Sequence, residues 1–359
     1  KSAAELKKIM QAKGHTWRDF AVAGGGGDSA MTVLKSRVIS GNPPSAAQVK
    51  GPAIQEWASE GVLGNMDALA KSEKWDEALP KVVADVMKYK GNYVAAPVNV
   101  HRVNWIWASS DALKKAGVAA MPKTWDEFFA AADKLKAAGL IPVAHGGQNW
   151  QDFTTFESVV LGVGGPKFYQ DALVKLDDKA LTSDTMKKSL ETFRRIKTYT
   201  DPGAPGRDWN LATAMLIQGK AGFQLMGDWA KGEFIAAGKA PGKDFMCAAA
   251  PGTANAFTFN VDSFILFKLK DAAAQKAQSD LASAIMSPGF QEVFNLNKGS
   301  IPVRAGQSMD KFDDCAKASA KDFADTAKSG GLVPSVAHGM AIAPATEGAI
   351  KDAVSQFWN

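Results

Sequence analysis

The chain has 359 residues, of which 46% are hydrophobic and 22% are charged, and its formal net charge is +5. A chain of this length is too long for one ordinary core and predicts two domains of roughly 150 to 200 residues each. Basic and acidic residues are interleaved along the chain, which argues against a nucleic-acid-binding face. No apolar run reaches the roughly 18 residues that a membrane span needs.

The N-terminal third alternates between helical and strand-like patterns. Leu6, Ile9 and Met10 share one face of a helix over the first residues, and Gly14 is placed to end it. The stretch 16–23 has the composition of a strand and is followed by a glycine turn and a helix. This alternation predicts an α/β protein with a mostly parallel sheet.

Four consecutive glycines, Gly24 to Gly27, precede the second predicted helix, which Asp28 or Ser29 would cap. A phosphate-binding loop needs lysine and then serine or threonine after its last glycine. Asp28 stands there instead, and a carboxylate at a helix N-terminus repels phosphate. Two interpretations stay open: a plain turn and cap, or a segment lining a cleft for a neutral polar ligand.

The middle and C-terminal parts continue with strands and capped helices. Pro52 suits the first turn of a helix, and Thr124 with Glu127 forms a capping-box motif before another. Residues 92–108 and 256–270 predict two long strands, and residues after 298 an extended exit, so the chain offers three crossings between domains.

Two residue types that often carry chemistry give few signals here. The four histidines lack metal-ligand spacing and no nucleophile motif accompanies them, so we expect no metal and no cofactor; they are His15, His101, His145 and His338. The only cysteines, Cys247 and Cys315, are compatible with a disulfide or with two buried free thiols.

Tryptophan is more informative, because the chain has 10 and several stand beside polar groups. Trp150 follows Gln148, and Trp229 follows Asp228. A flat indole ring beside hydrogen-bonding groups suits a pyranose, whose C–H face stacks on the ring while its hydroxyls bind in the plane. For any single tryptophan, packing in the core is the competing interpretation.

Several segments together resemble bacterial periplasmic sugar-binding proteins of ABC importers. They are VKGPAIQEWA, PVNVHRVNWIW, AHGGQNWQDF, FQLMGDWAKGEF, FTFNVDSFILF, NKGSIPVR and PSVAHGMA. The chain is most similar to the glucose-binding members of extracellular solute-binding protein family 1, which also holds the maltose-binding protein. The resemblance implies two α/β lobes joined by a hinge of crossing segments, one of residues 1–106 and 263–304 and the other of residues 107–262 and 305–359.

The resemblance also implies a set of sugar-binding residues and no catalytic ones. The lysines would donate to ring hydroxyls, the Asp and Asn side chains would accept from them, and Trp229 would stack on the sugar. The residues on the more specific motifs are Lys50, Asp228, Trp229, Asn260, Asp262, Lys298 and His338, and those on shorter motifs are His101, Gln148 and Trp150. The implied function is capture of a monosaccharide, D-glucose above others, by a periplasmic monomer that delivers it to membrane permease subunits.

Family members begin with a strand and a tryptophan-rich turn that this sequence lacks before Lys1. We therefore expect the first lobe to lack its first strand, as in a truncated chain. Two other functions stay open. A glycoside hydrolase would use Asp228 and Asp262 as an acid and base pair roughly 5 to 10 Å apart, and an adhesin or chemoreceptor domain would share the fold.

Overall fold

The chain forms two compact units in the computed structural model, which describes residues 2–22 and 28–359. The glycine run Gly24–Gly27 lies outside the described residues, so neither interpretation of it is tested. Unit 1 comprises Lys1–Val100, Val261–Asn297 and Ile301–Ser308, and unit 2 comprises His101–Asn260, Lys298–Ser300 and Met309–Asn359. The lobe boundaries expected from the sequence stay a prediction. Compared with the two units, they assign residues 101–106 and 298–300 to the first lobe instead of unit 2, and residues 261–262 and 305–308 to the second lobe instead of unit 1.

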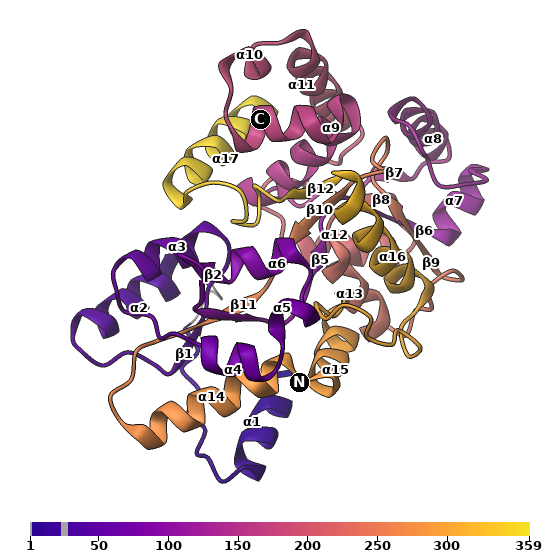
Figure 1. Ribbon diagram of the computed structural model, residues 1–359. Helices are drawn as coiled ribbons and strands as arrows, with labels where there is room; N and C mark the ends of the chain where they lie inside the picture. Colours follow the sequence, from indigo (N-terminus) through magenta and orange to yellow (C-terminus); the bar gives the residue numbers. More distant parts are fainter. Residues whose placement is uncertain (1, 23–27) are drawn as a thin grey trace. The chain divides into compact units, whose positions relative to one another are not determined.

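Unit 1 contains a three-stranded sheet, a two-stranded hairpin and most of the short helices (Figure 1). The sheet has the order β1 (Ala46–Gln48), β11 (Ser263–Leu266), β4 (Ala95–Pro97), and the hairpin joins β2 (Lys88–Tyr89) to β3 (Asn92–Tyr93). The helices are α1 (Ser2–Ala12), α2 (Asp28–Ile39), α3 (Pro52–Ser59), α4 (Asp67–Ser72), α5 (Trp75–Ala78), α6 (Lys81–Val86), α14 (Ala272–Met286) and α15 (Pro288–Lys298).

The first helix confirms its predicted apolar face and its predicted end. Leu6 and Met10 are each 4% exposed, and α1 packs against α14. Gly14 follows the helix with φ +84°, a left-handed conformation that glycine adopts without a steric penalty. His15 then lies 2.7 Å from Asp280 of α14, so the helix is held at its C-terminal end as well as along its face.

The strand predicted for residues 16–23 is wrong over the described part, residues 16–22, which form no regular element. Phe20 is 61% exposed, and the indole of Trp17 donates to Asp19 two residues further on. Strand-forming residues make a strand only where a neighbouring strand and a core receive them. Here most side chains of the segment are exposed, and Trp17 and Val22 are only partly buried.

Unit 2 contains two sheets. One has the order β7 (Ile141–Val143), β8 (Ala221–Leu225), β6 (Trp105–Ser109), β9 (Phe245–Ala249), and the other has the order β12 (Leu332–Pro334), β10 (Phe257–Asn260), β5 (His101–Arg102). Only the β7–β8 and β10–β12 pairs are parallel among the described strands. The expectation of a mostly parallel sheet is therefore wrong. The strands that flank the two crossings pair with one another in antiparallel fashion, β4 with β11 and β5 with β10.

Helices make up most of the rest of unit 2. They are α7 (Ser110–Ala116), α8 (Trp125–Ala137), α9 (Asn149–Tyr169), the π-helical turn η1 (Gln170–Val174), α10 (Asp178–Leu181), α11 (Asp184–Lys197), α12 (Trp209–Ile217), the 3₁₀ turn η2 (Asp228–Ala230), α13 (Lys231–Ala236), α16 (Asp314–Ser329) and α17 (Pro344–Trp358). The hydroxyl of Thr124 accepts from the Glu127 amide at 3.1 Å, as the capping motif predicts. The Glu127 carboxylate instead accepts from the amide of Lys123.

The two long strands expected at residues 92–108 and 256–270 are interrupted. The first becomes β3, β4, β5 and β6, and the second becomes β10 and β11. The cause is a change of sheet: β4 pairs with β11 in unit 1, whereas β5 pairs with β10 in unit 2. Between these strands the Asn99 side chain accepts from the Asp262 amide at 2.9 Å, and the Val98 amide donates to the Asp262 carbonyl, so a side-chain bond supplements the backbone bonds at the crossing.

The cysteines form a disulfide, which settles the alternative left open by the sequence. Cys247 of β9 bonds to Cys315 of α16, across 68 residues of chain. Both cysteines belong to unit 2. The bond therefore ties α16 to the edge strand of the four-stranded sheet.

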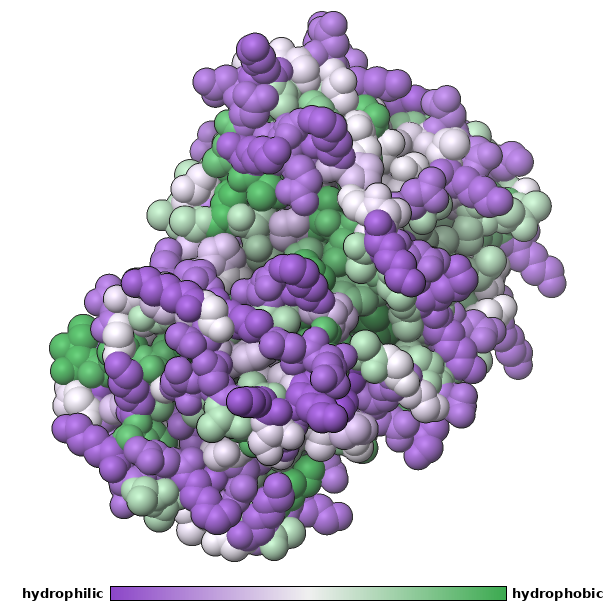
Figure 2. All heavy atoms as spheres, in the orientation of Figure 1, coloured by the Kyte–Doolittle hydropathy of each residue, from purple (hydrophilic) through white to green (hydrophobic). Residues whose placement is uncertain are grey.

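The visible surface is mostly hydrophilic, with an apolar area beside α2 (Figure 2). Large apolar side chains fill the interiors instead, such as Trp75 in unit 1 and Phe128, Phe153 and Phe193 in unit 2, all fully buried. None of the helices formed by residues 2–22 and 28–359 is long and apolar enough to cross a membrane.

Candidate functional site

A buried histidine–aspartate pair lies at the centre of the predicted residues of unit 2. His101 Nδ1 is 2.5 Å from Asp228 Oδ1, and the Arg102 amide donates to Asp228 Oδ2 at 2.9 Å. Asp228 is the first residue of η2, three positions after the end of β8, and His101 is the first residue of β5. Both oxygens of the Asp228 carboxylate are thus bound by one short strand, which fixes the His101 ring.

The turn before Asp228 has room only for glycine at position 227. A Cβ at this position would lie 2.1 Å from the ring of Trp229, closer than any real contact. The indole therefore lies directly over the Gly227 backbone. The sequence Gly-Asp-Trp is a unit in which the glycine makes room for the ring and the aspartate receives His101.

Three further rings gather around Trp229 to form an aromatic cluster of His101, Trp150, Trp229 and His338. The Trp229 ring centroid is 5.3 Å from that of His101 and 4.8 Å from that of His338, and Trp150 is 5.7 Å from His338. Trp150, Trp229 and His338 are only partly buried. Part of each of these three rings is therefore exposed to solvent, unlike the rings of a core cluster.

Asn260 contributes an unsatisfied polar group next to this cluster. It is the last residue of β10 and pairs directly with His101 in antiparallel register, so the two side chains lie on the same face of the sheet. Asn260 is 3% exposed, and its Oδ1 has no hydrogen-bond partner among the described residues. Leaving a buried amide oxygen unpaired costs roughly 1 to 3 kcal/mol. A hydroxyl group that donated a hydrogen bond to this oxygen would remove that cost.

Gln148 has its amide engaged by its neighbours. Its Oε1 accepts from Trp150 Nε1 at 2.9 Å and from Gln151 Nε2 at 3.1 Å, and its Nε2 donates to Asp208 at 2.6 Å. These bonds orient the Trp150 indole. Gln148 thus contacts Trp150 of the aromatic cluster, and its hydrogen bonds indicate a role in orienting that ring.

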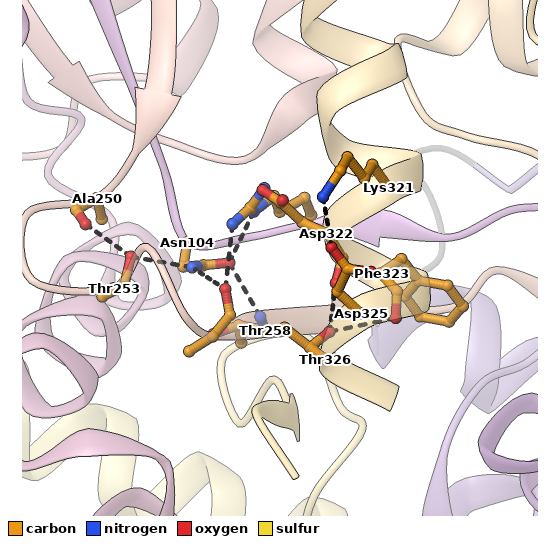
Figure 3. A network of polar contacts seen from close by, with 11 residues as sticks. Asn104, Ala250, Thr253, Thr258, Lys321, Asp322, Phe323, Asp325 and Thr326 are labelled. Carbon is orange, nitrogen blue, oxygen red and sulfur yellow. Dashed lines mark hydrogen bonds and ion pairs between the residues drawn. The ribbon is translucent and has the colours of Figure 1, made fainter. Parts of the chain in front are cut away.

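The strand that carries His101 is anchored by a buried polar network, part of which Figure 3 shows. The guanidinium of Arg102 is fully buried and donates to Asp322 of α16 at 2.6 Å and to the carbonyl of Ala256. Asn104 accepts from the Thr258 amide and donates to Thr253. Burial lowers the pKa of Arg102, while the Asp322 carboxylate opposes that shift. The network fixes β5 against β10 and α16.

Two residues that the sequence did not single out hold His338 in place. Thr154 Oγ1 is 3.2 Å from His338 Nε2, and Glu157 binds the turn that precedes His338 through its side chain. Burial raises the pKa of Glu157 to about 7, opposed by its hydrogen bonds. Thr154 and Glu157 follow Trp150 on α9 at helical spacing, and that spacing is the signal that could have pointed to them.

A second group of predicted residues meets in unit 1. Lys50 Nζ lies 4.0 Å from Asp262 Oδ1, and Asp262 also accepts from Asn99 at 2.9 Å and from Gln48 at 3.5 Å. Asp262 is 5% exposed, whereas Lys50 is partly exposed. The sequence predicted Lys50 and Asp262 and missed the two amide side chains.

The Lys298 side chain does not join either group of predicted residues. It ends α15 and its side chain is exposed. The next residue, Gly299, has φ +85°, and a Cβ there would lie 2.8 Å from the Asp228 carbonyl oxygen. The backbone after Lys298 thus passes close to Asp228, while the Lys298 side chain points to solvent.

The geometry gives the hydrolase alternative no support. Asp228 belongs to unit 2 and Asp262 to unit 1, and each carboxylate accepts two hydrogen bonds within its own unit. Within residues 2–22 and 28–359, no three His, Cys, Asp or Glu side chains are grouped so that they could hold a metal ion.

The two-unit α/β fold and the aromatic, hydrogen-bonding cluster define a solute-binding protein. The chain belongs to the bacterial extracellular solute-binding protein family, whose model matches residues 3–284. A "Probable sugar-binding periplasmic protein" of Brucella suis is 49% identical over 354 residues, which are 99% of this chain and 83% of that protein. An "Uncharacterized ABC transporter extracellular-binding protein" of Pyrococcus horikoshii is 33% identical over 94% of this chain and 75% of its own length.

A more distant relative carries a specific sugar in its name. The glucose-binding protein GlcS of Saccharolobus solfataricus is 25% identical over 62% of this chain and 42% of its own length. Among solved structures, a chitin oligosaccharide binding protein has a TM-score of 0.80 and 20% identity, covering 99% of this chain and 90% of that one. MalE3 of T. maritima with bound maltose has a TM-score of 0.76 and 19% identity, covering 99% and 89%.

These likenesses confirm the solute-binding-protein fold predicted from the sequence. The predicted periplasmic location is confirmed by relatives named as periplasmic proteins. The chain belongs to a family of solute-binding proteins, and these relatives are named as sugar-binding or ABC-transporter binding proteins rather than as enzymes. Which sugar it takes is a separate question.

Proposed function

We propose that this protein captures a monosaccharide, D-glucose in preference to others, and delivers it as a monomer to the permease subunits of an ABC importer. The observation that carries the proposal is the buried, unpartnered Oδ1 of Asn260 on the same sheet face as His101, beside a partly exposed Trp229 ring. An apolar ligand would leave that oxygen unsatisfied. A sugar offers hydroxyl donors and a flat C–H face together.

Each side chain of the unit 2 group has a role in this proposal. Trp229 supplies the stacking surface, Asn260 accepts from one hydroxyl, and the His101–Asp228 pair fixes the edge of the ring that the sugar meets. Trp150 and His338 extend the aromatic surface. None of these roles needs a changed covalent bond, in keeping with a receptor.

The predicted residues of unit 1 belong to the same proposal. Lys50 and Asp262 would pair with further hydroxyls, and Lys298 would donate to one. We propose that sugar binding favours a closed arrangement of the lobes by a population shift, since a ligand stabilises the state in which it makes more contacts. Small-angle scattering with and without D-glucose measures this change directly.

Preference for glucose rests on the acceptor that meets the fourth hydroxyl. One lost hydrogen bond of this kind is worth roughly 1 to 3 kcal/mol, which would separate the affinities for glucose and galactose by roughly 5-fold to 150-fold. The name of the GlcS relative supports glucose as the first sugar to test.

The test is a thermal-shift and tryptophan-fluorescence series with D-glucose, D-galactose, D-mannose and D-xylose. We expect saturable binding of D-glucose and a loss of affinity of tenfold or more in Asn260→Ala and Trp229→Ala. Asn255→Ala is the matched control, because Asn255 is exposed. Equal affinity of the Asn260 and Asn255 variants, or no response to any monosaccharide, would contradict the proposal; release of nitrophenol from an aryl glucoside would favour the hydrolase.

A further inference from the structure

Glu157 is a buried carboxyl group with an unusual set of donors. It is 0% exposed and accepts from Ser335 Oγ at 2.6 Å, from the Val336 amide at 2.8 Å and from the Ala337 amide at 3.0 Å. The Tyr169 hydroxyl donates to it at 3.1 Å. Three of these four donors belong to one turn, so a single side chain fixes the course of the backbone there.

That turn leads directly to His338. The His338 amide donates to Ser335 Oγ at 3.2 Å, and the same oxygen donates to Glu157. His338 is therefore joined to the Glu157 carboxyl through one hydroxyl group. Next to it, the His338 ring lies against Trp229 and Trp150.

One face of α9 supplies three side chains that support His338, directly or through the 335–337 turn. Trp150 provides a ring, and Thr154 Oγ1 lies 3.2 Å from the His338 ring. Glu157 comes nearly one further turn along the same helix. Because α9 is continuous from Asn149 past Glu157, the spacing between these supports is fixed by helix geometry.

We propose that Glu157 is a positioning residue of the binding site, which sets the place of the His338 ring by holding the turn of residues 335–337. One consequence of this inference rests on the proposed function: the affinity for sugar should depend on Glu157 although Glu157 does not contact the sugar. In Glu157→Gln, one of the two accepting oxygens would be replaced by an NH₂ group, which cannot accept from the donors of Ser335, Val336, Ala337 or Tyr169. The turn would then shift, and the His338 ring with it.

The experiment is histidine NMR, which is practicable because the chain has only 4 histidines. The ring resonances are assigned with His338→Gln and followed in Glu157→Gln without sugar and then with D-glucose. We expect the His338 signals to move while those of His15 stay in place. Affinity for D-glucose should fall roughly tenfold, the loss expected for one well-placed hydrogen bond.

The matched control is Asp152→Asn, another buried carboxyl of α9. Asp152 binds His145 and Ser355 instead of the 335–337 turn, so its variant should move the His145 signals and leave glucose affinity unchanged. Should Glu157→Gln fail to fold, Ser335→Ala removes the link to His338 alone and should shift the His338 signals less.

The inference is overturned if the His338 signals are unchanged in the variant, or if Glu157→Gln costs no more affinity than Asp152→Asn. If the wild-type protein binds none of the sugars, the proposed function fails. The His338 signals then still decide whether Glu157 positions the ring.

Discussion

His101 and Asp228 are bonded at 2.5 Å although 127 positions separate them in the sequence. His101 begins the strand by which the chain enters unit 2, and Asp228 begins the turn after β8. The pair therefore links the two sheets of unit 2 at the point where the aromatic cluster forms. Preorganisation of this kind lowers the entropy that a ligand must overcome on binding.

Asp228→Asn should lower the free energy of unfolding by about 1 to 3 kcal/mol. The amide can still accept from one donor, but its N–H₂ group faces the Arg102 amide or His101, so one bond is lost. Urea unfolding followed by tryptophan fluorescence measures the effect.

Asp208→Asn is the matched control for that measurement. Asp208 is exposed and binds only the Gln148 side chain in the described structure, so its variant should unfold like the wild type. Equal midpoints for the two variants would show that the His101 bond contributes nothing to stability.

Asp322→Ala should destabilise the protein by about 2 kcal/mol, because it leaves the buried Arg102 guanidinium without its anionic partner. The figure is below that for a fully buried pair, since the Asp322 side chain is 34% exposed. The control lies on the same helix: Asp325 pairs with Lys321 in an exposed contact, as Figure 3 shows. Asp325→Ala should leave the thermal midpoint unchanged, and a comparable loss in both variants would contradict the assigned role of Arg102.

Local signals in the sequence predicted local structure well. The Thr124 cap, the proline start of α3 and the glycine after α1 each depend on a few neighbouring residues and a backbone preference. The motif around Asp228 and Trp229 could be predicted from the sequence because these two residues lie in one short local turn, η2.

Other features depend on partners that a linear pattern does not contain. The breaks in the two long strands arise where the chain changes sheet, and the apolar composition on both sides of Asn99 and Asp262 hides that change. Glu157 stands in an apolar helix run, and nothing in sequence links it to the turn 178 residues away that supplies its donors. The exposed side chain of Lys298 likewise follows from where α15 ends.

Removing the disulfide should destabilise the protein by about 4 kcal/mol in the loop-entropy model, because the bond closes a loop across 68 residues. The double variant Cys247→Ser with Cys315→Ser, compared with the reduced wild type, separates loss of the bond from the change of side chain. Both should show the same lowered urea midpoint. A reduced protein as stable as the oxidised one would show that the unfolded chain is not constrained by this bond.

The stability of the protein should carry a pH dependence that traces to Glu157. Burial raises the pKa of this carboxyl to about 7 from an ordinary value of 4.5, so the folded protein holds a proton that the unfolded chain releases between these values. The contribution to stability is fully present below about pH 4.5 and is lost as the pH rises through about 7, by about 3 kcal/mol in all. The titratable group in contact with the carboxyl is Tyr169, whose own pKa is raised by burial and by Glu157, so it stays neutral over this range.

Glu157→Gln cannot titrate, so the free energy of unfolding of the wild type minus that of the variant isolates the effect. Other carboxylates act in the opposite sense: the pKa of Asp201, for example, is lowered by its hydrogen bond with Arg207, so its stabilisation is lost toward low pH. Those groups are common to both proteins and cancel in the difference. We expect the difference to decrease steadily from pH 4.5 to 8 in urea titrations, and a difference that is flat over this range would mean that Glu157 is ionised throughout.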